Sequence, residues 1–78
     1  MITKNKIKIK KVPEYAIILR ALRESKRMKQ QNLAKRLGMS AMGLSHFEKG
    51  TRIPNVQKLE RWANELGAEI ILTIQKKR

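Results

Sequence analysis

The chain has 78 residues, of which 41% are hydrophobic, and its nineteen Lys and Arg against six acidic residues give a formal net charge of +13. This length suits one small domain, whose core supplies only about 3–5 kcal/mol, so we expect self-association to add stability. The lack of cysteine excludes disulfides and cysteine-based zinc sites, and the charge favours nucleic acid over an anionic membrane as the partner.

The residue inventory argues against an enzyme. All six acids are scattered Glu, there is no Asp or Cys, and His46 is the single histidine. These residues provide no nucleophile paired with a base, and we expect neither a metal nor a cofactor. No signal-peptide cleavage site follows the basic N-terminus, and no apolar run approaches the roughly 20 residues that span a membrane. We therefore expect a cytoplasmic protein that makes no membrane contact.

The first twelve residues form a basic segment. Residues 3–11 hold five lysines and no acid, and Ile7 and Ile9 alternate with lysines. A period of two predicts a strand, whereas a disordered basic arm would have the same composition, so both interpretations stay open. Pro13 ends the segment and suits the first turn of a helix.

Helical periodicity starts after Pro13. The first predicted helix covers residues 14–26, and its buried stripe is Tyr15, Ile18, Leu19, Leu22 and Ser25. The second predicted helix covers residues 30–37 and buries Leu33, Ala34 and Leu37.

The residues that follow have the order of a helix-turn-helix. Gly38 suits the left-handed position after a helix, and Ser40 is a natural N-cap for a third helix over residues 41–49. Gly50 ends that helix, whose Leu44 and Phe47 point inward together. Because Ala34 is small where the two helices would meet, the spacing indicates close packing of the pair.

The last third of the chain predicts one more helix and a strand. Asn55 can cap a helix over residues 56–66, which Gly67 stops and whose apolar face is Val56, Leu59, Trp62, Ala63 and Leu66. The β-branched segment that follows predicts a strand with Ala68, Ile70, Leu72 and Ile74 on one side. A lone strand is unstable, so it pairs either with residues 5–12 or, as we expect, with a second copy of the chain.

The predicted fold class is therefore mostly α. It comprises a repressor-like domain of four to five helices with a C-terminal strand, and an optional N-terminal strand, in a small intersubunit sheet. The expected segments are a basic arm or strand (1–12), a DNA-binding domain (13–67), and a dimerisation strand with a basic tail (68–78).

Residues 22–67 resemble the phage-repressor-like (Xre/Cro-type) helix-turn-helix family. The resemblance rests on "LRESKRMKQQNLAKRLGMS", "LSHFEKGTRIPN" and "LERWANELG". The fourth helix followed by "GAEIILTI" is similar to the HipB- and HigA-type antitoxins, in which a C-terminal strand pairs across a dimer. The family implies a dimeric, sequence-specific regulator that binds double-stranded DNA with the third helix in the major groove.

The resemblance also implies roles for individual residues. Those expected to face the bases are Ala41, Met42, Ser45 and His46. Those expected to contact phosphates are Gln30, Ser40, Lys49, Thr51, Arg52 and Asn55. The residues expected to mediate dimerisation are Ile70, Leu72 and Ile74.

Three positions depart from the family's pattern. Ala41 stands where a polar base-reading residue is usual, Arg27 where glycine often follows the first helix, and Lys29 where Ser or Thr caps the second. Ala41 and Met42 cannot form bidentate bonds to a base, so we expect contact with thymine methyl groups and readout of DNA shape.

Glu48 would be repelled by phosphates, so we expect it to be structural, either pairing with Arg52 or capping nearby backbone groups. Two other functions remain open. The chain could be an antitoxin that binds a toxin protein and autoregulates its operon, or a basic protein that binds nucleic acid without sequence preference.

Overall fold

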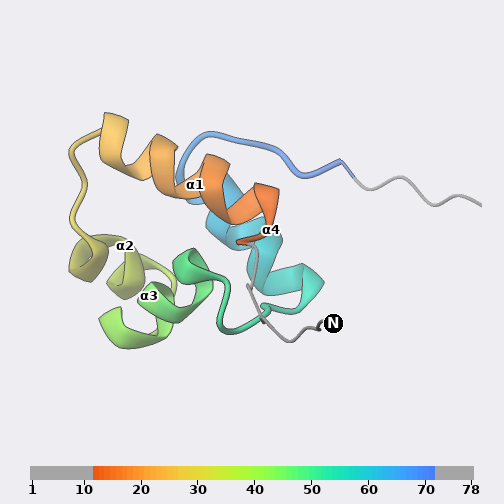
Figure 1. Ribbon diagram of the computed structural model, residues 1–78. Coiled ribbons are helices and arrows are strands. Elements are labelled where there is room, and N and C mark those ends of the chain that lie inside the picture. Colours follow the sequence, from red (N-terminus) through yellow and green to blue (C-terminus); the bar gives the residue numbers. More distant parts are fainter. Residues whose placement is uncertain (1–11, 72–78) are drawn as a thin grey trace, which may run out of the picture.

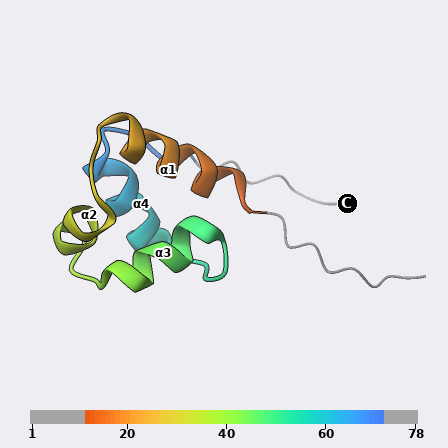
Figure 2. The same ribbon diagram turned by 60° about the vertical axis from the view of Figure 1, so that its left-hand side comes forward.

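The computed structural model describes residues 12–71. They form four helices (Figure 1), namely α1 (Glu14–Ser25), α2 (Gln30–Arg36), α3 (Ala41–Lys49) and α4 (Val56–Glu65). In Figures 1 and 2, α1 lies across the top of the molecule and α3 lies along the lower edge. The four predicted helices and their order are confirmed.

The core is built around Trp62, which is fully buried. Phe47 stacks on its ring at a centroid distance of 5.8 Å, and Tyr15 meets it edge-on at 6.3 Å. Aliphatic side chains from all four helices and the residues that follow them fill the remaining space: Ala16, Leu19, Leu33, Ala34, Leu37, Leu44, Ala63 and Leu66. None of the four helices is long and apolar enough to cross a membrane.

All four helices end in the same way. A residue with a positive φ follows each helix, directly after α3 and one residue later after α1, α2 and α4: Arg27 (55°), Gly38 (69°), Gly50 (79°) and Gly67 (75°). This residue and its successor donate their backbone N–H groups to carbonyls of the last turn, which is the Schellman arrangement. The predicted stops at the three glycines are confirmed, and Arg27 takes the same conformation without being glycine.

The helix starts also follow the local sequence. Ser40 Oγ accepts a hydrogen bond from the Gly43 backbone N–H (3.0 Å), and Asn55 Oδ1 accepts one from Lys58 (2.7 Å). Both predicted N-caps are therefore confirmed. Lys29 supplies no side-chain cap to α2, as its side chain has no acceptor.

The predicted buried stripe of α1 was partly wrong. Ile18 is 51% exposed and Ser25 is exposed, whereas Ala16 and Arg23 are buried. The helix turns Arg23 inward because α3 offers this side chain a buried partner, described below. On α4, the predicted core residue Val56 is likewise 51% exposed.

The predicted C-terminal strand is not formed in the part of the chain that the structure describes. A strand needs a neighbour to complete its backbone hydrogen bonds, and residues 12–71 supply none for residues 68–71. The alternation of sides is nevertheless present, since Ala68 and Ile70 pack against the core while Glu69 and Ile71 are exposed. Leu72, Ile74 and the predicted N-terminal strand lie outside the described residues.

Replacing Arg27 with glycine should stabilise the fold by about 0.5–1 kcal/mol, because glycine adopts a positive φ without steric cost. Denaturant unfolding measures the change. Arg27→Ala is the matched control, since it removes the same charge but keeps a Cβ atom. An equal gain in both variants would assign the effect to charge and contradict the conformational explanation.

Candidate nucleic-acid interface

The turn between α2 and α3 sets the angle of the two helices. The chain reverses at Gly38, and the Met39 backbone N–H donates a hydrogen bond to the Ala34 carbonyl at 3.0 Å. Ala34 is 1% exposed and Leu44 is fully buried, so both helices are anchored on their inner sides. The predicted helix-turn-helix geometry is confirmed, and the opposite side of α3 faces outward.

That outward side carries an open hollow. It is lined by Gln30, Ala41, Met42, Ser45, His46 and Lys49. The structure thus brings together all four residues predicted to face bases and two of those predicted to contact phosphates. None of the six lining residues is acidic, and Met42 projects with 71% of its surface exposed. The surface is therefore compatible with a negatively charged partner.

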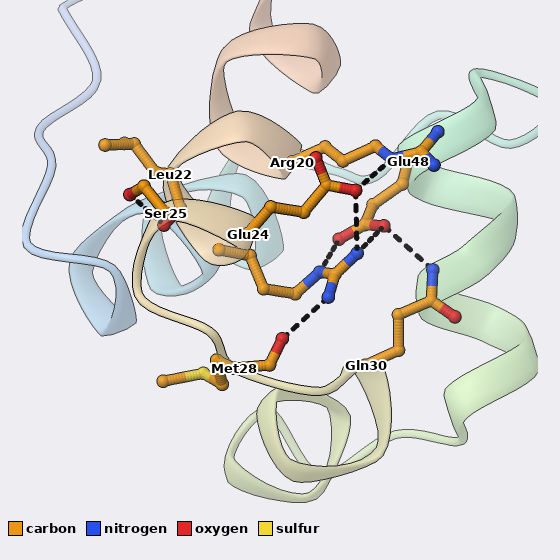
Figure 3. A network of polar contacts seen from close by, with 8 residues as sticks. Arg20, Leu22, Glu24, Ser25, Met28, Gln30 and Glu48 are labelled. Atoms are coloured by element: carbon orange, nitrogen blue, oxygen red, sulfur yellow. Dashed lines mark hydrogen bonds and ion pairs between the residues drawn. The ribbon is translucent and has the colours of Figure 1, made fainter.

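A buried ion pair lies behind this surface (Figure 3). Arg23 donates from Nε to Glu48 Oε2 at 2.7 Å and from Nη2 to Oε1 at 3.1 Å. Its Nη1 donates to the Met28 carbonyl at 2.7 Å. Arg23 is only 8% exposed and Glu48 only 2%. The prediction that Glu48 pairs with Arg52 was wrong, because Glu48 faces the core side of α3 while Arg52 is exposed in the following loop.

Gln30, which lines the hollow, is hydrogen-bonded to the ion pair. The Gln30 side chain donates from Nε2 to Glu48 Oε1 at 2.8 Å, which connects the first residue of α2 to α3. This bond uses one of the two N–H groups of the amide and leaves the other for an external acceptor. Because Arg23 compensates the carboxylate, Glu48 can hold Gln30 without presenting a net negative charge to a phosphate.

The other four residues predicted to contact phosphates do not line the hollow: Ser40, Thr51, Arg52 and Asn55. Ser40 and Asn55 use their side-chain oxygens as helix caps, so the Ser40 hydroxyl hydrogen and the Asn55 NH₂ group are their donors to an external phosphate. Arg52 and Lys49 are exposed. Thr51 instead contacts His46, whose Nδ1 lies 2.8 Å from its hydroxyl oxygen.

The predicted dimerisation residues form no visible site. Ile70 is half-buried against the core of its own chain, and the other two lie outside the described residues. Within residues 12–71, no group of three or more His, Cys, Asp or Glu is arranged to hold a metal ion.

Sequence reasoning missed the role of Arg23. The signal was present, because Ala16, Leu19 and Arg23 follow helical spacing along one face. A charged residue in such a stripe requires a buried partner of opposite charge. Glu48, adjacent to Phe47 on the buried side of α3, was the acidic residue that could pair with Arg23.

Two comparisons agree with this geometry. A helix-turn-helix family model matches residues 19–71. Uncharacterized HTH-type transcriptional regulators of Mycobacterium bovis and of two Mycobacterium tuberculosis strains are 43% identical to this chain over 49 residues. The match covers 63% of this chain but only 19% of each relative, so the chain spans about a fifth of the relatives' length.

Replacing Glu48 with alanine should lower the free energy of unfolding by about 3–5 kcal/mol, because Arg23 then stays buried without its partner. That loss approaches the whole stability expected of so small a domain, so circular dichroism should show a largely unfolded chain.

Two further variants isolate the cause. The double change Arg23→Met with Glu48→Leu should recover most of the loss, since neither charge is then buried. Arg20→Ala breaks only an exposed pair with Glu24 and should cost less than about 0.5 kcal/mol. A well-folded Glu48→Ala variant would mean that the ion pair does not hold α1 to α3.

Proposed function

Since the chain belongs to the helix-turn-helix family, we propose that it is a sequence-specific transcriptional regulator that binds double-stranded DNA through α3. The observation that carries this proposal is the hollow on the outward side of α2 and α3. It gathers apolar, polar and basic groups on a helix narrow enough for the major groove. Naming of the mycobacterial relatives as transcriptional regulators supports the same role.

Phosphate contacts would supply much of the affinity. The net charge of +13 favours a polyanion, and both Lys49 at the end of α3 and Arg52 in the loop that follows are exposed. Gln30 adds a donor whose position is fixed by Glu48. Ser40 and Asn55 complete the proposed phosphate contacts. Thr51, which we also expected to contact a phosphate, has its hydroxyl and its backbone N–H engaged with His46, so we do not propose that role for it.

Base recognition would combine apolar and polar contacts. Ala41 and Met42 offer methyl groups to thymine, and the high exposure of Met42 gives it reach into the groove. Ser45 and His46 line the same hollow and supply hydrogen-bonding atoms. DNA shape and basic residues outside α3 would contribute the remaining specificity.

We further propose that the active form is a homodimer acting as a repressor at a palindromic operator. One α3 contacts a single half-site, whereas two copies would reach successive major grooves. Ile71, which is 81% exposed, offers one apolar side chain for such a contact, on the side of the C-terminal segment opposite Ile70. We propose that residues 13–67 bind DNA and that residues 1–12 form a basic segment before them. Residues 68–78 would mediate dimerisation through Ile70, Leu72 and Ile74.

Random-site selection with the purified chain, run beside a measurement of its mass in solution, tests these proposals. A preferred palindrome and a dimeric mass support them. Equal competition by random duplex would leave only non-specific binding. Co-purification of a toxin protein would instead favour the antitoxin role.

Binding to the selected site should weaken by roughly 10³–10⁵-fold between 50 and 200 mM salt if six to ten phosphates are contacted. Lys49→Ala should lower the salt slope by about one and weaken binding to all sequences alike. The matched control is Lys26→Ala, which removes an exposed lysine that does not line the hollow. Equal effects of both variants would show that only total charge matters.

Replacing thymines of the selected site with uracil should weaken binding at the positions that face Ala41 and Met42, because the methyl contacts are lost. A titration of each uracil-substituted duplex measures the effect. Met42→Ala should make binding less sensitive to the replacement. Unchanged affinity for every uracil duplex would place the specificity elsewhere, for example in the N-terminal segment.

A further inference from the structure

We propose that Thr51 fixes the tautomer of His46, so that the neutral ring presents Nε2 as a hydrogen-bond acceptor and selects adenine or cytosine at one position of the site. This inference rests on the proposed function. It assigns to Thr51 a positioning role and to His46 a defined choice of base.

The Thr51 hydroxyl has only one hydrogen to donate, and this determines the tautomer of His46. Thr51 Oγ1 lies 3.2 Å from the His46 carbonyl oxygen and 2.8 Å from His46 Nδ1. A hydroxyl has a single hydrogen, and a carbonyl can only accept. If that hydrogen goes to the carbonyl, Nδ1 must carry its own proton and donate to Oγ1. Both contacts are hydrogen bonds only in this arrangement, which leaves Nε2 of the neutral ring unprotonated.

The backbone holds Thr51 in this place. Gly50 has φ 79°, and this turn lets the Thr51 N–H donate to the His46 carbonyl at 3.0 Å. A Cβ atom on residue 50 would lie 2.6 Å from Pro13 Cδ and 3.3 Å from Val12 Cα. The end of α3 is therefore packed against the residues that precede α1, and the turn at Gly50 sets Thr51 beside His46.

The His46 ring belongs to the proposed base-reading surface. His46 follows Met42 by four residues, so both lie on the same face of α3, and both line the hollow with Ser45. The ring is half-buried, which limits its freedom to reorient. A group held in this way presents one fixed hydrogen-bonding pattern to a ligand.

The chemistry of the major groove then gives the choice of base. Adenine presents its N6 amino group and cytosine its N4 amino group, and both can donate to an acceptor. Guanine presents N7 and O6, and thymine presents O4, which are acceptors. An unprotonated Nε2 therefore favours adenine or cytosine over guanine or thymine at the position that it faces.

Nitrogen NMR tests the tautomer directly in the full chain. At mildly alkaline pH, long-range proton–nitrogen spectra should show a protonated Nδ1 and an unprotonated Nε2 in the wild type and in Thr51→Ser. Thr51→Val keeps the shape but removes the hydroxyl, and should lose this preference. A wild-type ring protonated at Nε2 would overturn the proposal.

Site selection tests the consequence. The wild type and Thr51→Ser should prefer adenine or cytosine at one position, and Thr51→Val and His46→Ala should lose about three- to tenfold of that discrimination. Where adenine is selected, replacing it with purine, which lacks the amino group, should weaken the wild type by a similar factor and His46→Ala by much less.

The outcomes separate the two proposals. A selected sequence that is identical for the wild type, Thr51→Val and His46→Ala overturns the inference and leaves the proposed function standing. The lack of any selected sequence overturns the proposed function, and the assigned base preference with it. Circular dichroism confirms that each variant is folded before its site is compared.

Discussion

The buried pair of Arg23 and Glu48 is the interaction on which the arrangement of the helices depends. Each charge loses several kcal/mol of hydration when it leaves water, so each requires the other at short distance. Their two hydrogen bonds join α1 to α3, and the Gln30 amide adds α2 to the same carboxylate. The third guanidinium nitrogen binds the Met28 carbonyl between α1 and α2. A single ion pair therefore fixes three helices and the connection between two of them.

This pair also explains two features of the surface. Because Arg23 must face α3, the apolar side chains Ile17 and Ile18 on α1 remain 56% and 51% exposed. Because the pair is internally compensated, a carboxylate can lie directly behind a surface that we propose binds phosphates. Gln30 gains a fixed orientation from an acid that would otherwise repel the ligand.

The helix ends add a second, local level of organisation. The same left-handed turn follows each helix, and after α3 it brings Thr51 back beside His46 of that helix. At Gly50 this turn packs against Pro13 at the start of α1. The turn that caps α3 therefore also positions Thr51 against His46 of the proposed base-reading surface. The lack of bidentate readers at Ala41 and Met42 makes the chemistry of His46 correspondingly important.

The sequence by itself determined the helix order, the caps at Ser40 and Asn55 and the stops at three glycines. These features depend on residues within about one turn, so local chemistry is sufficient to predict them. The residues that share the outward side of α3 were expected from the family resemblance. Only the tertiary structure decided that Arg23 is buried, that Glu48 is its partner and that Ile18 and Val56 are exposed. The two charged residues are 25 positions apart, and the side of α1 that is buried depends on the surface against which it packs. The same reason leaves the C-terminal segment without strand structure in residues 68–71, since a strand requires a partner that periodicity alone cannot supply.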